Sequence, residues 1–219
     1  MLAGAAQTFR LFPAQGSRLL VLRKDSLAVI ILLTGLTGIT PLSIDMPLAG
    51  LPPLAAAFGE PEARVQLVVG VFLAGFALAQ LVLGPVSDRF GRRPVLLSGL
   101  AVYTIVGFAC MFAESLDVLL PLRFIQGVAA CAGPVVARAV VADVYEGKAA
   151  QRAMSIVTAG MGLAPIVAPM IGGVLMTWFE WTSVFLTLGL TGVLLLSMVQ
   201  VLLGETLSQR DPNAFRLRG

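Results

Sequence analysis

Two charged residues lie inside long apolar stretches of the sequence, where a charge needs a physical reason. Arg123 begins the sequence Arg-Phe-Ile-Gln-Gly, and Asp45 is the one acid in the stretch 26–50. An arginine within a membrane span costs about 2.5–3.5 kcal/mol on insertion scales, so it normally faces a cavity or a partner. Gln126, three residues later, falls on the same helix face. Asp45 and Arg123 are expected at similar depth, where pairing would relieve both charges.

Such a pair has a definite chemistry. A carboxylate in a partly dry cavity gains a proton more readily than in water, and a neighbouring arginine opposes this, which is the physical basis of a proton switch. Two other interpretations stay open. Arg123 could extend its charged end to the outer interface, and Asp45 could simply end its helix near the outer surface.

A charged turn provides the sharpest local motif. It runs Gly84-Pro-Val-Ser-Asp88-Arg89-Phe-Gly91-Arg92-Arg93-Pro94. Gly84 is expected to let helix backbones approach, and Gly91 to permit a tight reversal. Asp88 lies among three arginines and is expected to hold the turn in one geometry through them. An ordinary basic loop with a turn glycine would explain the arginines but not the position of Asp88.

Small residues recur every three or four positions between Gly160 and Gly173. The run reads Gly160-Met-Gly162-Leu-Ala-Pro165-Ile-Val-Ala168-Pro169-Met-Ile-Gly172-Gly173. This spacing predicts a flat helix face for close packing, with the two prolines on one side. Ordinary packing of small residues explains the run equally well.

Composition decides the broad class of protein. Of the 219 residues, 58% are hydrophobic and only 12% are charged, whereas soluble domains are about 45–50% apolar and about 25% charged. A soluble enzyme, a nucleic-acid binder and a disordered protein are therefore excluded. With no histidine and only two cysteines, Cys110 and Cys131, a Cys/His metal site and a Cys–His nucleophile are excluded as well. We expect neither an enzyme nor a bound cofactor.

These motifs must be positioned by membrane helices. A span needs about 20 apolar residues to cross ~30 Å of hydrocarbon. Six stretches qualify: 26–50, 65–86, 94–113, 117–141, 151–177 and 182–203. The sequence therefore predicts an all-α, polytopic membrane protein with a bundle of six transmembrane helices. Prolines in the first and fifth stretches predict kinks there.

The distribution of charge orients the bundle. Of the 15 bases, only Arg64 falls in a predicted outer loop and only Arg123 lies well inside a helix, if both termini are cytoplasmic. The remaining bases lie in the two tails, the inner loops and the inner end of the fourth helix, as the positive-inside rule requires. Trp178 and Trp181 flank the outer turn between the last two helices, at the interface that indoles prefer. The first 24 residues lack the pattern of a cleavable signal peptide.

The motifs together resemble the major facilitator superfamily, and its Bcr/CflA drug-resistance branch in particular. The charged turn contains the whole pattern G-x-x-x-D-R-x-G-R-R, Arg123 to Gly127 matches the element R-x-x-Q-G, and the fifth helix resembles the antiporter motif G-P-x-x-G-G with Ala168 in place of its first glycine. Similarity covers about residue 26 to Thr206. Where the family often has an aromatic residue, this chain has Pro47, and where it often has a second arginine, this chain has Ala142.

The resemblance implies a proton-driven, multi-pass exporter of diverse drugs or other amphipathic small molecules in the bacterial inner membrane, with the proton gradient as its energy source. Asp45, Arg123 and Gln126 would take part in proton coupling. The charged turn would form a cytoplasmic gate, with Arg138 and Asp143 as possible partners. The antiporter motif would comprise Pro165, Ala168, Pro169, Gly172 and Gly173. Gln80, Gln126, Tyr103 and Met161 are candidates for lining the substrate site.

The resemblance also implies a domain organisation. A basic cytoplasmic tail (1–25) would precede the six-helix bundle (26–204), and residues 205–219 would resemble the start of a central linker. The fold would be the N-terminal half of the superfamily fold, built from two inverted three-helix repeats. Transport by two rocking bundles then requires a second six-helix bundle, either a C-terminal half or a second copy in a homodimer. The alternative is a non-transporting scaffold or remnant that associates with a partner bundle.

Overall fold

The structure is a computed structural model that describes residues 27–207, and within that range it contains helices and no β-strand. The predicted tail 1–25 and the bases at 210, 216 and 218 lie outside the described residues. In chain order the helices are α1 (Leu27–Leu48), α2 (Leu51–Phe58), α3 (Glu62–Val65), α4 (Leu67–Phe90), α5 (Arg92–Cys110), α6 (Leu116–Ala130), α7 (Ala132–Val144), α8 (Gly147–Trp178) and α9 (Thr182–Leu202).

Six segments of the described chain are long and apolar enough to cross a bilayer. The second span combines α3 with α4, the fourth combines α6 with α7, and α1, α5, α8 and α9 each form one. The shortest, α5, has 19 residues, or about 28 Å at ~1.5 Å per residue. The six predicted spans and the all-α class are thus confirmed, with boundaries that agree to within about one helical turn.

Proline explains two interruptions of the helices. Pro52 and Pro53 occupy the first turn of the short helix α2, where a missing amide N–H costs nothing. Pro134 cannot donate to the carbonyl of Ala130, and the fourth span is broken at Cys131, between α6 and α7. This break was not predicted from the sequence. The kinks expected in the first and fifth helices stay a prediction.

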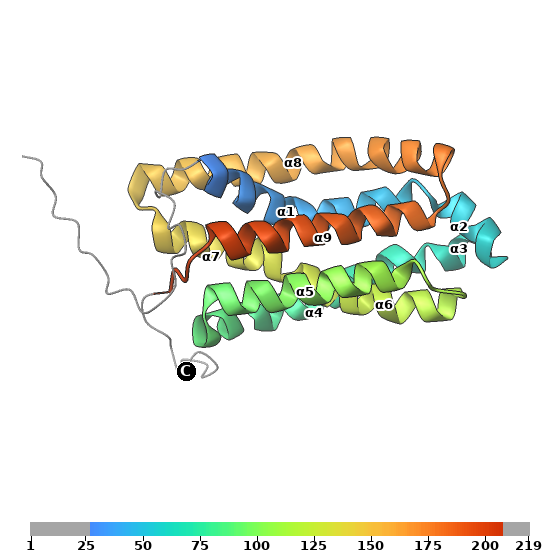
Figure 1. The fold of residues 1–219 in the computed structure, drawn as a ribbon, viewed down its shortest axis with the longest axis horizontal. Helices are drawn as coiled ribbons and strands as arrows, with labels where there is room; N and C mark the ends of the chain where they lie inside the picture. The colour runs from blue at the N-terminus through green and yellow to red at the C-terminus, as the bar shows by residue number, and fades with distance from the viewer. Residues whose placement is uncertain (1–26, 208–219) are drawn as a thin grey trace, which may run out of the picture.

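The spans pack as two inverted triplets. The most extensive contacts join α1 with α8, α4 with α6 and α5 with α9, and in Figure 1 these helices run side by side along the long axis. In span numbers these pairs are one with five, two with four, and three with six. If each of the first three spans is exchanged with the span three places later, the pair one–five becomes four–two and the pair three–six is unchanged. This is the symmetry of an inverted repeat, which the sequence alone did not reveal.

Close helix crossings depend on glycine. On α4, a Cβ at Gly75 would lie 2.3 Å from the carbonyl oxygen of Phe124. On α6, a Cβ at Gly127 would lie 2.1 Å from the carbonyl oxygen of Phe72. Each glycine therefore admits the backbone of the other helix at the same crossing, as small residues do in membrane bundles.

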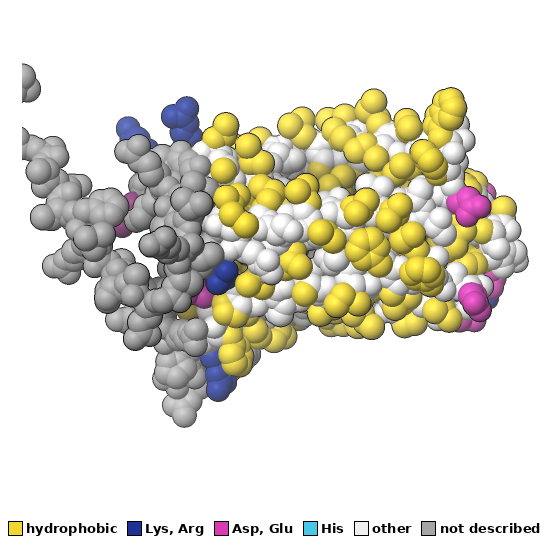
Figure 2. Space-filling model, in the orientation of Figure 1, with side chains coloured by type: hydrophobic (Ala, Val, Ile, Leu, Met, Phe, Trp, Pro, Cys, Tyr) yellow, Lys and Arg dark blue, Asp and Glu magenta, His cyan; other side chains and the backbone are white. Residues whose placement is uncertain are grey.

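The two ends of the bundle differ in charge. Figure 2 shows Lys and Arg side chains gathered at one end of an apolar bundle, and Asp and Glu side chains mostly at the other. We name the first the Arg92 end, after the α4–α5 turn, and the second the Trp181 end, after the α8–α9 turn. The start of α1 and the end of α9 both lie at the Arg92 end in Figure 1.

The glycine crossing makes a stability prediction. Gly127→Ala is expected to lower the midpoint of thermal unfolding in detergent, because overpacking a tight contact costs about 1–3 kcal/mol. Gly70→Ala is the matched control on α4, since a Cβ at Gly70 meets no atom of the described residues within 4 Å. A Gly127→Ala protein as stable as the Gly70→Ala protein would show that the α4–α6 crossing is looser than described.

Candidate functional site: the Arg123 centre and the Arg92 cluster

Arg123 lies inside the bundle and is completely buried. Its guanidinium donates from Nη2 to the carbonyl of Ser43 at 2.6 Å, from Nη1 to Oε1 of Gln126 at 2.6 Å, and from Nε to the carbonyl of Val68 at 3.3 Å. These acceptors come from α1, α6 and α4, so one side chain connects three spans. Gln126, also fully buried, shares the helix face of Arg123 as its spacing predicted.

Two aromatic rings enclose the charge of Arg123. The guanidinium carbon lies 4.5 Å from the ring centroid of Phe72 and 5.8 Å from that of Phe185. Both separations fall within the range of cation–π attraction, which strengthens when the cation is shielded from water. The interpretation in which Arg123 extends to the outer interface is therefore wrong, since its charge is held within the bundle.

Asp45 does not pair with Arg123. Within residues 27–207 no ion pair joins them, and Asp45 is half-buried rather than enclosed. The geometry of α1 explains why. Ser43 lies two residues before Asp45, so their side chains point about 200° apart on the helix, and the Ser43 side chain faces inward. The expected direct pair is wrong, although both residues lie toward the Trp181 end of their spans.

Ser43 and Tyr103 complete the centre and were not predicted to do so. The Ser43 hydroxyl donates to the carbonyl of Ile39 at 2.7 Å and lies 2.7 Å from the hydroxyl of Tyr103. Because a serine hydroxyl has one proton, Tyr103 must donate in the second bond. Tyr103 is fully buried, so it contacts Ser43 inside the bundle and does not line an open cavity. The position of Ser43, two residues before the one acid of the stretch 26–50, was the only sequence signal available.

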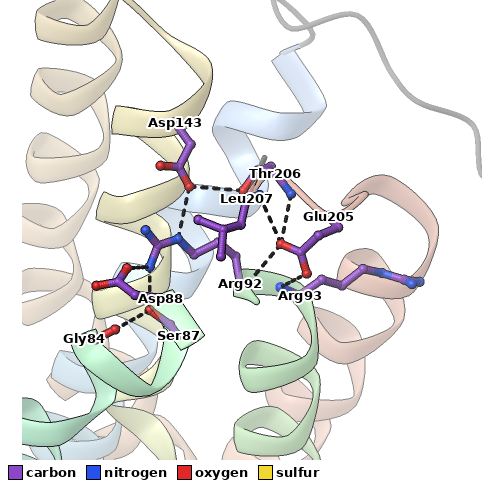
Figure 3. Close-up of polar contacts among 9 residues, drawn as sticks. All are labelled: Gly84, Ser87, Asp88, Arg92, Arg93, Asp143, Glu205, Thr206 and Leu207. Atoms are coloured by element: carbon purple, nitrogen blue, oxygen red, sulfur yellow. Dashed lines mark hydrogen bonds and ion pairs between the residues drawn. The ribbon is translucent and has the colours of Figure 1, made fainter. Parts of the chain in front are cut away.

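The Arg92 cluster assembles the charged turn (Figure 3). The largely buried side chain of Arg92 forms ion pairs with Asp88 Oδ1 at 2.5 Å and with Asp143 Oδ2 at 3.0 Å. Its Nη1 also donates to the hydroxyl of Ser87 at 2.6 Å, which in turn donates to the carbonyl of Gly84 at 2.9 Å. The structure thus brings the predicted residues Asp88, Arg92 and Asp143 together, with Arg92 at the centre.

The other arginines predicted for this site differ in what they contact. Arg89 lies over the ring of Phe90 at 5.6 Å, and Arg93 donates to the carbonyl of Gln200 at 3.2 Å. Arg138 lies outside the cluster: it is exposed and its Nε donates to the carbonyl of Pro134, one turn earlier on its own helix. Arg138 lies five residues before Asp143, about 140° around the helix, so the two cannot face the same turn. Its expected contact with the loop is wrong.

Glu205 was missed. Although the sequence analysis placed it in the tail, its carboxylate accepts the backbone N–H of Arg92 at 3.0 Å and that of Arg93 at 3.4 Å, as Figure 3 shows. It also accepts the amides of Thr206 and Leu207, each at 3.1 Å. The first amides of α5 have no partner within the helix, and a carboxylate is favourable at this end of the helix dipole. Glu205 therefore joins the end of α9 to the start of α5.

The two turn glycines have different roles. Gly91 has φ of +105°, and a Cβ there would lie 2.5 Å from Oε2 of Glu205, so only glycine permits both the turn and the capping carboxylate. Gly84 differs, because a Cβ at this position would meet no atom of residues 27–207 within 4 Å. The expectation that Gly84 admits a neighbouring backbone of the described chain is wrong.

The small residues of α8 fall on two faces. Ala168 and Gly172 are buried, and a Cβ at Gly172 would lie 2.6 Å from the carbonyl of Met46 on α1. Pro165 and Pro169 are both exposed, and Gly173 has open space beside it among the described residues. Close packing is therefore confirmed for the α1 side, while the two prolines share the exposed side as predicted.

The described residues offer no cluster of metal ligands. No group of three or more His, Cys, Asp or Glu side chains is placed to hold a metal ion in residues 27–207. The Nε2 atom of Gln126 is buried without a hydrogen-bond partner there, so the Arg123 centre retains one unused donor. The arrangement provides a positive charge on Arg123 that hydrogen bonds hold in place, a separate carboxylate in Asp45, and the ion-pair cluster of Arg92 at one end of the bundle.

Six spans in inverted triplets, with a buried arginine and a charged turn at one end, have the architecture that alternating-access secondary transporters use for one of their bundles. The particular family follows from comparison with known proteins. Residues 33–217 match the profile of the Major Facilitator Superfamily, and the chain belongs to that family.

Among curated relatives, Multidrug resistance protein MdtL of Shewanella oneidensis is 35% identical over 175 residues, which are 80% of this chain and 44% of the relative. MdtL of Escherichia coli O139:H28 is 36% identical over 166 residues, which are 76% of this chain and 42% of the relative. The chain therefore spans less than half the length of these relatives.

Two solved structures share the fold. The human organic anion transporter MFSD10 (TETRAN) superposes with a TM-score of 0.64 at 24% identity, over 88% of this chain and 51% of that one. A bacterial homologue of the human lysosomal transporter Spinster, in an inward-facing and unoccupied conformation, gives 0.68 at 18% identity, over 84% of this chain and 43% of that one.

The Arg92 cluster generates the second prediction. Asp143→Asn is expected to lower the thermal unfolding midpoint in detergent more than Asp88→Asn, because the Asp143 side chain is 22% exposed and the Asp88 side chain 44%. A shielded hydrogen bond to a charged group contributes about 1.5–3 kcal/mol, whereas an exposed pair contributes about 0–1 kcal/mol.

Glu146→Gln, an exposed acid beside α8, is the matched control and is expected to leave the midpoint unchanged. Equal losses in the Asp143→Asn and Asp88→Asn proteins would contradict the central position of the Arg92–Asp143 pair.

Proposed function

We propose that this chain is one bundle of a proton-coupled multidrug exporter, a drug:H⁺ antiporter of the Bcr/CflA branch. The relatives named for multidrug resistance support drugs as the class of substrate. The match covers less than half the length of those proteins. The observation that carries the coupling is the separation of charges in the outer half of the bundle. Arg123 is fully held by the protein, while the half-buried carboxylate of Asp45 is free of it.

In this mechanism Asp45 takes up and releases the proton. Because no ion pair within residues 27–207 occupies the half-buried side chain of Asp45, its carboxylate is available to exchange a proton. Arg123 holds a fixed positive charge against the carbonyl of Ser43, two residues before Asp45 on α1. Gln126 accepts a hydrogen bond from the guanidinium and so holds it in place.

The Arg92 cluster would act as the cytoplasmic gate. The basic Arg92 end faces the cytoplasm under the positive-inside rule, so both termini are cytoplasmic in a bacterial inner membrane. There the ion pairs of Arg92 join the α4–α5 turn to α7, and Glu205 joins it to α9. A gate of this kind closes when these ends are held together and opens when the pairs separate.

Drug export further requires a second six-helix bundle, either the C-terminal half of a full-length transporter or a second copy. α4 and α8 are the least buried spans of the described chain, so they are the faces that a second bundle would cover. The exposed side of α8, with Pro165, Pro169 and Gly173, belongs to this surface.

Asp45→Asn tests the coupling. In proteoliposomes with an imposed pH gradient, ethidium flux through the wild-type chain is expected to depend on the gradient. The Asp45→Asn protein is expected to lose this dependence, because an amide cannot exchange a proton, while it keeps its folded far-UV spectrum. Loss of at least about 90% of the gradient-dependent rate corresponds to ~1.4 kcal/mol.

Glu114→Gln serves as control, because Glu114 is an exposed acid between the third and fourth spans. It is expected to transport like the wild type. Gradient-driven flux in the Asp45→Asn protein equal to that of the control would rule out Asp45 as the coupling carboxylate. Folded wild-type protein that moves no ethidium would instead show that this bundle does not transport without the second bundle.

A further inference from the structure

One of the bonds that hold Arg123 depends on a proline. In a regular helix the carbonyl of Ser43 would accept the amide N–H of residue 47, four positions later. Residue 47 is a buried proline within α1, which has no N–H to donate. The carbonyl of Ser43 is therefore left without its helical partner, and Arg123 Nη2 donates to it at 2.6 Å.

The bond lengths agree with this explanation. Nε of Arg123 also donates to the carbonyl of Val68, at 3.3 Å. That carbonyl lies four residues before Phe72, whose amide is available as its helical donor within α4. The carbonyl that a proline releases thus forms the shorter bond to the guanidinium. A free carbonyl also has its full acceptor capacity, and hydrogen bonds from charged donors are short and strong.

α1 contains an internal comparison. Pro41 is likewise buried within the helix and releases the carbonyl of Thr37 in the same way. No side-chain donor of the described residues contacts that carbonyl, whereas the one released by Pro47 receives the arginine. The two prolines therefore differ in what they provide to the rest of the bundle, although they act alike on the helix.

We propose that Pro47 is a positioning residue for Arg123: by withholding its amide, it makes the Ser43 carbonyl the acceptor that fixes the guanidinium between α1, α4 and α6. The Tyr103–Ser43–Ile39 hydrogen bonds hold the same turn of α1 in place. This position directs Arg123 to the carbonyl of Ser43 instead of the carboxylate of Asp45, and its relevance to transport rests on the coupling role proposed above for those two residues.

The test compares residues that differ only in an N–H group. Pro47→Ala restores a donor for the Ser43 carbonyl, whereas Pro47→lactate, introduced as an ester-linked residue, has the same side chain as alanine and no N–H. The readout is the exchange rate of the Arg123 guanidinium protons in the full chain, measured by NMR after ¹⁵N-arginine labelling and assigned by the loss of the signal in Arg123→Lys.

Pro47→Ala is expected to raise this exchange rate by about tenfold or more, as for loss of a hydrogen bond to a charged group. Pro47→lactate is expected to exchange like the wild type, and so is Pro41→Ala. A Pro47→Ala protein with wild-type exchange would overturn the proposal. So would a lactate protein that exchanges as fast as the alanine protein, or equal acceleration by Pro41→Ala, since each would show that the N–H at position 47 is irrelevant.

Flux measurements separate this proposal from the proposed function. Gradient-dependent ethidium flux is expected to fall in Pro47→Ala and to return in Pro47→lactate. If Asp45→Asn leaves flux unchanged, the coupling mechanism fails, but the exchange rates still decide whether Pro47 positions Arg123. If Pro47→Ala does not fold, the exchange rate in Pro47→lactate decides: wild-type protection supports the proposal, and rapid exchange contradicts it.

Discussion

A guanidinium within a bundle of apolar helices must have its donors satisfied by the protein, because neither lipid nor bulk water can do so. The bundle depends on how Arg123 meets this constraint. Its acceptors lie on α1, α4 and α6, and two aromatic rings cover its faces. α1 and α4 make few direct contacts with each other, so the arginine links spans that packing alone leaves nearly separate. Its removal would leave the carbonyl of Ser43 and the side-chain oxygen of Gln126 without a partner in the interior.

The Arg92 end obeys a second constraint, the unsatisfied amides at the start of a helix. Glu205 supplies a carboxylate to the first amides of α5, and Gly91 leaves room for it. The side chain of Arg92 then forms ion pairs with Asp88 on α4 and Asp143 on α7. The fourth span connects both centres, because α6 carries Arg123 and α7 carries Asp143, and the break at Cys131 lies between them. A helix interrupted at this point allows its two halves to be held by different partners.

Prolines in this chain release carbonyls as well as interrupt helices. Pro134 leaves the carbonyl of Ala130 without a donor and coincides with the break between α6 and α7. Pro47 leaves the carbonyl of Ser43 free inside a continuous helix, where an arginine from another span takes it. The same covalent feature thus produces a helix break in one place and a hydrogen-bond contact in another. Which of the two results depends on whether a donor from a neighbouring helix is within reach.

The sequence by itself determined the class of fold and the depth of its charges. Apolar stretches of about 20 residues specify membrane spans, the asymmetry of Lys and Arg predicts orientation, and local spacing placed Gln126 beside Arg123 and Asp88 beside Arg92. These properties depend on residues near one another in the chain. The partners of Arg123 on α1 and α4, the exclusion of Arg138 from the Arg92 cluster and the capping by Glu205 were decided only by the tertiary structure. Each depends on the rotation of one helix against another, and a difference of a few residues along a helix changes the direction of a side chain by more than 100°.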